Sequence, residues 1–193
     1  GTGEFSCPAI SKGAYVFLTD ISENSLKVAK YRFKKYSNKV SYVVADMENL
    51  PFKNNFFNVV ISAGSLSYGD HDLVRKEIYR VLKNNGYFIC IDSLDHNLIY
   101  RLNRFVHYIK GKRTLITIRR IPKIKLIKSY FDFGWGEIHF FGSFIWLVKI
   151  LENFLSSRKI IQISKTLDKL FANYLTAFNF VMIVKKIIPN QKQ

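Results

Sequence analysis

Four short apolar runs, separated from one another by helical or polar stretches, constrain the fold of this chain more than any other feature. The runs are Ala14–Thr19, Val40–Val44, Phe56–Ala63 and Tyr87–Asp92, and all are rich in β-branched or aromatic residues. Strands that alternate with helical patterns form βαβ units, in which parallel strands are covered by helices. The sequence therefore predicts an α/β fold with a mainly parallel sheet.

The segments between these runs carry helix signals. Ser22 is a predicted N-cap, and Asp70 or Asp72 is the predicted N-cap of a second helix that runs through Leu82. Asn84-Asn85-Gly86 predicts the end of that second helix, because asparagine and glycine adopt the left-handed backbone conformation that stops a helix. Each predicted strand is thus followed by a helix or loop of a length that suits a crossover.

The second half of the chain has a different pattern. Residues 95–130 are predicted to be mostly helical, and 137–141 and 178–184 are predicted strands, with a helix from Ser143 to about Leu155 between them. Two late strands with a long connection predict an antiparallel finish to the parallel sheet. We expect one domain over 1–193.

The net charge of +16 is concentrated in the second half. Residues 1–92 carry a net charge of +3 and residues 93–193 carry +13, while the segment 95–130 holds ten Lys and Arg against one acid, Asp95. Such a field attracts anionic ligands over long range. A general abundance of Lys, Asn and Ile, typical of AT-rich genomes, is an alternative explanation of the charge.

Cysteine usage and hydropathy indicate where the protein works. Cys7 and Cys90 are the two cysteines, which suits a reducing cytoplasm, and no apolar run reaches the roughly 18 residues of a membrane span. We expect a cytoplasmic protein. The aromatic side chains of the helix near Trp146 are expected to pack on the sheet, with peripheral membrane contact as the alternative.

Three features fall at the predicted carboxyl ends of strands, where open α/β sheets bind ligands. Gly1-Thr2-Gly3 lets a ligand approach the backbone closely. Asp20 ends the next strand, where a carboxylate can accept hydrogen bonds from both hydroxyls of a ribose. Asp46 ends the strand after that, where it can accept from an adenine amino group while Met47 packs on the ring.

Several runs resemble the motifs of class I S-adenosylmethionine-dependent methyltransferases. The match covers 1–92 well and the remainder loosely. The Asp46 loop is the sharpest match, and Asn58 stands where the family usually has Asp. The matching runs are GTGEFS at 1–6, LTDIS at 18–22, VADMENLPF at 44–52, FFNVVIS at 56–62 and YRVLKNNG at 79–86.

The resemblance implies S-adenosylmethionine as cofactor and assigns residues to it. Gly1 and Gly3 would lie beside its methionine part, as would Ser62 and Ala63 at the end of the third predicted strand. Asp20 and Ile21 would hold the ribose and flank the adenine, and Asp46 and Met47 would hold the adenine.

The resemblance also implies a Rossmann-like three-layer αβα sandwich. In the family a first strand lies between the strands that correspond to 14–19 and 56–63, and this sequence begins after it. We therefore expect these two strands to lack their shared partner, and we expect this chain to have low stability, weak cofactor binding and low or no activity.

The acceptor side is predicted to lie in 93–193, with 95–130 as a basic helical insertion over the active site. The acceptor is expected to be a small molecule, a glycan or a lipid-linked compound, and nucleic acid is a less favoured partner. An oxygen acceptor would need a general base, for which the candidates are His71, Asp92 and His96. The His and Cys spacing predicts no metal site.

Two other functions are compatible with parts of the sequence. An NAD-binding oxidoreductase would use Gly-x-Gly-x-x-Ser with Asp20, but the loop from Asp46 to Phe52 and the lack of a Tyr-x-x-x-Lys pair count against it. A non-catalytic, basic nucleic-acid-binding module would show strongly salt-dependent binding.

Overall fold

The computed structural model describes residues 1–144, 146, 151–152 and 154–187. These residues form two compact units, Gly1–Lys53 and Asn54–Gln193. The prediction that the chain forms one domain stays a prediction.

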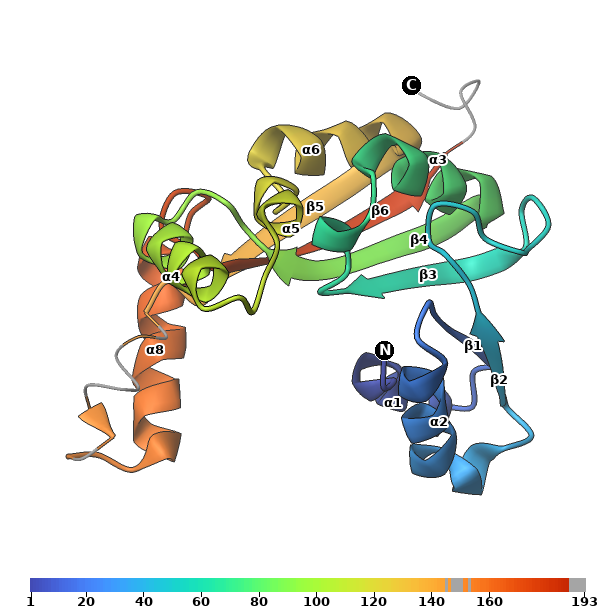
Figure 1. Ribbon diagram of the computed structural model, residues 1–193, viewed down its shortest axis with the longest axis horizontal. Helices are drawn as coiled ribbons and strands as arrows, with labels where there is room; N and C mark the ends of the chain where they lie inside the picture. Colours follow the sequence, from blue (N-terminus) through green and yellow to red (C-terminus); the bar gives the residue numbers. More distant parts are fainter. Residues whose placement is uncertain (145, 147–150, 153, 188–193) are drawn as a thin grey trace. The chain divides into compact units, whose positions relative to one another are not determined.

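The first unit is a βαβ unit (Figure 1). β1 (Val16–Asp20) and β2 (Val40–Val44) pair in parallel, and α2 (Glu23–Arg32) connects them. The Ser22 hydroxyl accepts a hydrogen bond from the Ser25 amide at 3.3 Å, so the predicted N-cap of α2 is confirmed. The two strands and the helix lie where the alternation of apolar runs predicts them.

A small apolar core holds this unit together. The short helix α1 (Cys7–Ser11) carries Pro8 in its first turn, where the missing N–H of proline costs nothing. α1 therefore brings Ile10, which is 1% exposed, into the core against β1 and α2. The buried members of the core are Ile10, Leu18, Leu26, Ala29, Phe33 and Val40.

The second unit contains a four-stranded sheet with the order β3-β4-β6-β5. Its strands are β3 (Phe57–Ala63), β4 (Leu82–Ser93), β5 (Gly134–Phe141) and β6 (Asn179–Lys186). β3 and β4 are parallel, and β6 is antiparallel to both of its neighbours, β4 and β5. The predicted antiparallel pairing in the C-terminal part of the sheet is confirmed, and it arises from a single reversed strand, β6.

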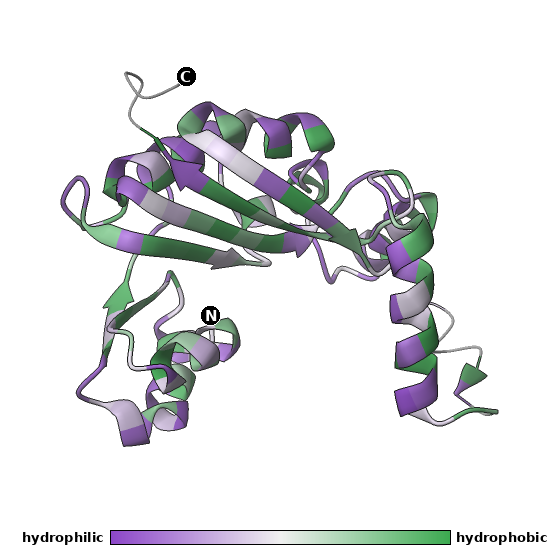
Figure 2. Ribbon diagram, turned by 180° about the vertical axis from the view of Figure 1, so that it is seen from behind, coloured by the Kyte–Doolittle hydropathy of each residue, from purple (hydrophilic) through white to green (hydrophobic). Residues whose placement is uncertain are grey.

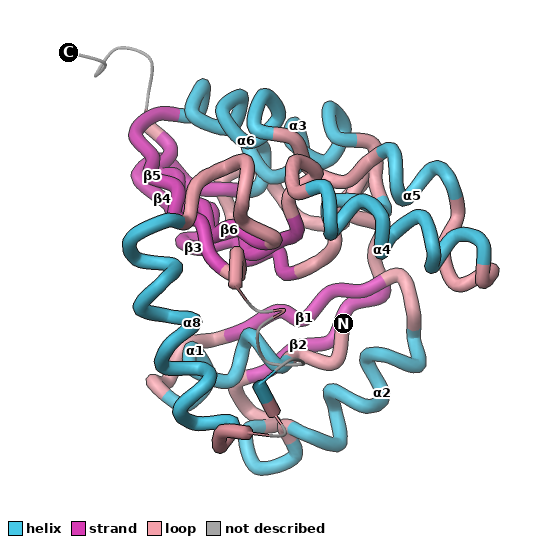
Figure 3. Tube along the Cα trace, turned by 90° about the vertical axis from the view of Figure 1, so that its left-hand side faces the viewer, coloured by secondary structure: helices cyan, strands magenta, loops and turns pink. Residues whose placement is uncertain are grey.

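One face of this sheet is the buried face. Phe88, Cys90 and Asp92 alternate along β4 and stand opposite Val184, Met182 and Phe180 of β6, and all six are 5% exposed or less. α3 (His71–Val81) and α6 (Ile124–Ser129) lie along one side of the sheet (Figures 1 and 3). Hydrophobic residues of β3, β4 and β6 gather in the middle of the strands, between more hydrophilic ends (Figure 2).

α3 differs in two details from the helix predicted there. Asp70 is its N-cap, since its carboxylate accepts from the Asp72 and Leu73 amides at 3.1 and 3.3 Å. The helix ends at Val81, and Leu82 is already extended and pairs with Phe57, so the predicted end at Leu82 and the stop at 84–86 are wrong. Asn85 does have a positive φ of 61°, but within β4, where the strand register shifts.

The basic segment is helical, as predicted. It forms α4 (Leu98–Ile109), α5 (Leu115–Arg119) and α6. α8 (Ser157–Phe171) was not predicted, and the helix predicted from Ser143 to about Leu155 includes residues 145, 147–150 and 153, which lie outside the described set. Among the described residues no helix is both long and apolar enough to cross a bilayer.

β1 pairs with β2 in one sheet, and β3 pairs with β4 in the other.

The Tyr130 hydroxyl is buried without a hydrogen-bond partner among the described residues, and its ring packs against Phe88 and Phe133. Because an unsatisfied buried hydroxyl is costly, Tyr130→Phe is expected to raise the free energy of unfolding by about 1 kcal/mol. That change corresponds to a melting temperature roughly 2–4 °C higher. A melting temperature at or below that of the parent chain would show that the hydroxyl is satisfied in solution.

Candidate functional site

Asp20 ends β1 with its carboxylate at the carboxyl end of the first sheet. Oδ1 accepts a hydrogen bond from the Ser22 amide at 2.7 Å. Partial burial acts to raise the pKa of this carboxyl, and the hydrogen bond from the Ser22 amide acts to lower it. Asp20 therefore places a hydrogen-bond acceptor at the tip of β1.

Asp46 follows the neighbouring strand tip. Asp20 pairs with Val44 at the end of the parallel ladder, and the Ala45 amide donates to the Asp20 carbonyl at 3.1 Å. Asp46 is the next residue, and its carboxylate is exposed while Oδ1 accepts from the Glu48 amide at 2.9 Å. The two predicted acids thus follow adjacent, hydrogen-bonded strands of one sheet.

Apolar side chains accompany these acids. Ile21 is 75% exposed directly after Asp20, and Met47 is half-buried directly after Asp46. Farther along the same loop, the Phe52 ring packs edge-on against Phe17 of β1 with 5.7 Å between ring centroids. The loop after β2 is therefore anchored to β1 at both of its ends.

Gly3 has a packing role in this structure. Its φ is +79°, and a Cβ built on it would come within 2.5 Å of the Phe33 ring and 3.1 Å of Leu18. A larger residue would strain the backbone and displace the core. Gly1 has only Asp20 Oδ2 near its Cβ position, at 3.9 Å, so the backbone beside that carboxylate is open.

The first unit has the side chains that a nucleoside requires. A ribose needs a paired acceptor for its hydroxyls, which the Asp20 carboxylate provides. A purine needs an apolar surface and an acceptor for its amino group, which Ile21, Met47 and Asp46 provide. The donor and acceptor chemistry of these residues therefore fits the adenosine part of S-adenosylmethionine.

In the second unit, Ser62 and Ala63 are the last residues of β3. The Ser62 and Ser65 hydroxyls are hydrogen-bonded at 2.7 Å. Gly64 follows with φ +67°, donates its amide to the Ile91 carbonyl at 2.8 Å, and has no atom within 4 Å of its Cβ position. The end of β3 therefore opens onto free space at Gly64.

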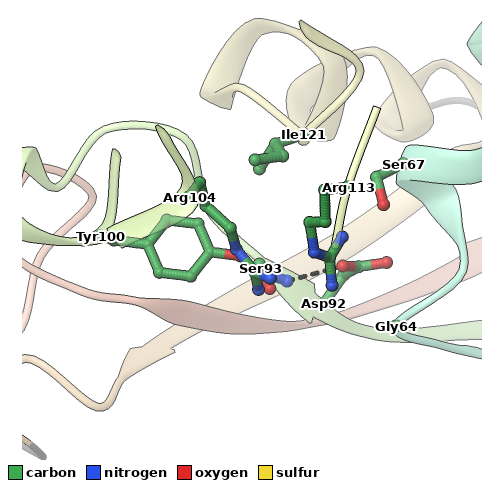
Figure 4. A pocket seen from close by; sticks show the side chains of 8 residues that line it. All are labelled: Gly64, Ser67, Asp92, Ser93, Tyr100, Arg104, Arg113 and Ile121. Atoms are coloured by element: carbon green, nitrogen blue, oxygen red, sulfur yellow. Dashed lines mark hydrogen bonds between the residues drawn. The ribbon is translucent and has the colours of Figure 1, made fainter. Parts of the chain in front are cut away.

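Gly64 lies in the wall of a cavity of about 170 Å³ at the carboxyl ends of β3 and β4 (Figure 4). The cavity includes one of the three predicted general bases, Asp92, together with side chains from α4 and from the loop before α5. Its lining residues are Gly64, Ser67, Asp92, Ser93, Tyr100, Arg104, Arg113 and Ile121.

Asp92 is 5% exposed and is fixed by its neighbours. Oδ2 accepts from the Leu66 amide at 3.0 Å and Oδ1 from the Ser93 amide at 2.7 Å. Burial raises the pKa of this carboxyl, and the effect exceeds the opposing one of these two hydrogen bonds and of the charges on Arg104 and His71. A carboxyl of this kind takes up and releases a proton closer to neutral pH than an exposed one.

The two predicted histidines do not line this cavity. His71 is the first residue of α3, and its Nε2 lies 2.7 Å from the Arg120 carbonyl oxygen, to which it donates. His96 Nε2 accepts from the Ile124 amide at 3.1 Å, and its ring packs edge-on against Tyr174. Both rings thus connect the basic helical segment to the sheet, and their catalytic roles stay predictions.

Most residues that line the cavity were not singled out by the sequence as site residues, among them Tyr100, Arg104 and Arg113. Tyr100 and Arg104 come from α4, and Arg113 comes from the loop before α5. The signal for them was the charge excess in 95–130, which identifies the segment but not the individual side chains. Among the described residues no group of three or more His, Cys, Asp or Glu is placed to hold a metal ion.

Residues 1–90 match the family model described as a methyltransferase domain. The chain is 35% identical over 165 residues to the ubiquinone/menaquinone biosynthesis C-methyltransferase UbiE of Pectobacterium carotovorum, which covers 74% of this chain and 66% of that protein. It is 36% identical over 96 residues to the UbiE of Neisseria meningitidis, which covers 48% of this chain. The chain spans 39% of the length of that relative.

Solved structures share the fold at low sequence identity. The geranyl diphosphate C-methyltransferase from Streptomyces coelicolor superposes with a TM-score of 0.67 at 15% identity, over 97% of this chain and 67% of that one. The MccD protein superposes with a TM-score of 0.63 at 20% identity, over 96% of this chain and 86% of that one.

These neighbours confirm the Rossmann-like αβα fold class. The family match falls on the same residues that carry the glycine turn, Asp20 and Asp46. Residues 1–90 therefore belong to the class I S-adenosylmethionine-dependent methyltransferase family.

Proposed function

We propose that this protein transfers a methyl group from S-adenosylmethionine to a small-molecule acceptor. The observation that carries the proposal is the placement of Asp20 and Asp46 after adjacent parallel strands, joined by the hydrogen bond from the Ala45 amide to the Asp20 carbonyl. Open α/β sheets bind nucleotides at this edge. The family match and the 35% identical relative support the same activity.

In this proposal Asp20 binds the ribose hydroxyls, and Asp46 accepts from the adenine amino group. Ile21 and Met47 flank the adenine ring, while the backbone of Gly1 and Gly3 lies beside the methionine part. Ser62 and Ala63, at the end of β3, are assigned to the same methionine part. The cofactor supplies a methyl group that is already activated by its positive sulfur.

Asp92 is the proposed general base. A nucleophilic acceptor atom takes the methyl group, the bond from methyl carbon to sulfur breaks, and the proton of the acceptor passes to the Asp92 carboxylate. The buried cavity orients the acceptor and excludes water from this step. Asp92 is chosen over His71 and His96 because it alone of the three lines the cavity among the described residues.

The acceptor class is part of the proposal. The relatives from Pectobacterium and from Oceanobacillus iheyensis, named as a ubiquinone/menaquinone C-methyltransferase and a demethylmenaquinone methyltransferase, favour an aromatic small molecule. A glycan or a lipid-linked acceptor remains the alternative from the sequence, as does peripheral membrane contact. The cytoplasmic location inferred from cysteine usage is proposed with it.

Transfer of a labelled methyl group tests this function. The chain is incubated with S-adenosyl-[methyl-14C]methionine and, separately, with demethylmenaquinone, a lipid-linked sugar and a polysaccharide fraction. Label in any one of these acceptors that disappears in Asp20→Asn supports the proposal. If the chain binds NADH and not S-adenosylhomocysteine in a parallel titration, the proposal is wrong.

A further inference from the structure

The cavity beside Asp92 has more positive charge than its one carboxylate balances. Arg104 of α4 and Arg113 of the following loop both line it. Figure 4 shows both arginine side chains among the residues that line the cavity. Two fixed cations against one acid leave a net positive charge inside a small, partly enclosed space.

Two polar groups of this cavity lack a hydrogen-bond partner among the described residues. They are the Tyr100 hydroxyl and Arg104 Nε, and both atoms are buried. Tyr100 is only 7% exposed, and Figure 4 shows its hydroxyl directed toward the other lining side chains. Because a buried polar group without a partner is costly, such a pair in a cavity wall indicates that a ligand supplies the missing bonds.

Both arginines are held in place by aromatic rings. The Arg104 guanidinium lies 4.5 Å from the centroid of the Tyr100 ring, and that of Arg113 lies 5.9 Å from the centroid of the Tyr68 ring. Stacking on a ring orients a guanidinium without using its N–H donors. The donors of Arg104 and Arg113 therefore stay available.

Other cations of the basic segment are already engaged. Arg120 pairs with Asp70 at 3.6 Å, and Arg101 and Lys123 lie 3.7 and 4.0 Å from the Asp95 carboxylate. Neither Arg104 nor Arg113 forms an ion pair of this kind within the described part of the chain. The segment thus separates its paired cations from two that face the cavity.

We propose that Arg104, Arg113 and the Tyr100 hydroxyl bind a phosphate group carried by the methyl acceptor. Two guanidinium groups present paired N–H donors that match the oxygens of a tetrahedral dianion, and a hydroxyl adds a third donor. A ligand that carried a single carboxylate in place of the phosphate would leave one of the two arginines without a partner. The inference rests on the proposed function, since it assumes that this cavity receives the acceptor.

Isothermal titration with phenyl phosphate at constant ionic strength tests the site directly. Arg104→Gln and Arg113→Gln are each expected to weaken binding about tenfold or more, because charge-assisted hydrogen bonds to phosphate are lost. Arg119→Gln is the matched control, since Arg119 is an exposed arginine of α5 that does not line the cavity. It is expected to change the affinity by less than about twofold.

Two further ligands define the class of acceptor. If the site binds the phosphate group of a larger acceptor and not a free phosphate ion, inorganic phosphate is expected to bind more weakly than phenyl phosphate. Benzoate is expected to bind more weakly still. Benzoate binding as tightly as phenyl phosphate, or equal losses in Arg119→Gln and Arg104→Gln, would overturn the proposal.

A pair of tyrosine variants separates ligand binding from stability. Tyr100→Phe and Tyr130→Phe each remove a buried hydroxyl without a partner among the described residues, so neither is expected to lower the melting temperature of the free chain. Only Tyr100→Phe is expected to weaken phenyl phosphate binding. Unchanged binding in Tyr100→Phe would remove that hydroxyl from the site.

Binding to the proposed cofactor site is measured separately with S-adenosylhomocysteine. The two arginine variants are expected to bind it as the parent chain does, whereas Asp20→Asn is expected to bind it more weakly and to keep its affinity for phenyl phosphate. If phosphate binding is unaffected by the arginine variants while S-adenosylhomocysteine still binds, the phosphate site is wrong and the methyltransferase proposal stands. If the arginine variants lose phenyl phosphate binding while the parent chain does not bind S-adenosylhomocysteine, only the methyltransferase proposal is contradicted.

Discussion

Asp92→Asn is expected to lower kcat by about 10²–10⁴-fold, the usual contribution of a positioned general base. Asparagine fills the same space but cannot take the acceptor proton. The parent chain is expected to show a rate that rises with pH through the raised pKa of Asp92, because only the ionised carboxylate is a base. That rising limb should be absent from the pH profile of the variant.

Methyl transfer to the most active acceptor, measured from pH 4 to pH 9, provides the test. The substituted amide side chain can keep only one of the two backbone hydrogen bonds that Asp92 accepts, so the melting temperature and S-adenosylhomocysteine affinity are measured alongside. His96→Gln is the comparison, since His96 lies outside the cavity. If kcat falls in His96→Gln and not in Asp92→Asn, the assignment of the base is wrong.

Asp20→Asn is expected to weaken S-adenosylhomocysteine binding by about 10–100-fold. The loss of charge-assisted hydrogen bonds to the ribose costs roughly 1.5–3 kcal/mol. Asparagine retains an oxygen that can accept from the Ser22 amide, so the start of α2 should remain intact. The effect is measured by isothermal titration with the parent chain as reference.

Glu23→Gln is the matched control for Asp20→Asn. Glu23 is an exposed acid in the first turn of α2 and pairs with Lys27 at 3.2 Å. Removing its charge changes the local field without touching the strand tip. Equal weakening in both variants would indicate a general charge effect in place of a specific ribose contact.

The alternation of apolar runs with helical patterns predicted the parallel strands, because a strand that is buried on both faces is a continuous apolar run in the sequence. The same reasoning placed Asp20 and Asp46 at neighbouring strand tips, which the pairing of Asp20 with Val44 confirms. Local chemistry was also sufficient for the Ser22 and Asp70 caps, whose hydroxyl and carboxylate satisfy nearby amides.

Other features depend on contacts that sequence pattern does not encode. α3 ends one residue earlier than predicted because Leu82 pairs with Phe57, a residue of a different strand. In the same helix Leu73 is 44% exposed and its neighbour Val74 is 1% exposed, because packing against the rest of the unit decides which face is buried. β5 begins at Gly134, earlier than predicted, because its glycines hide the strand pattern.

The cavity shows the same limit at the candidate site. Asp92 was a candidate general base because of its position at the end of an apolar run. Its placement in one cavity with Arg104 and Arg113 depends on how α4 and the following loop fold over the sheet. The segment 95–130 contains ten similar cations, and the sequence does not distinguish the three that pair with acids from the two that line the cavity.

The most direct test is the titration of adenosine alone against the parent chain, Asp20→Asn, Asp46→Asn and the double variant. Adenosine lacks the methionine part, so it reports only on the two strand tips. We predict that each single variant weakens adenosine binding and that the double variant weakens it further. Adenosine that binds both single variants as tightly as the parent chain would contradict the account.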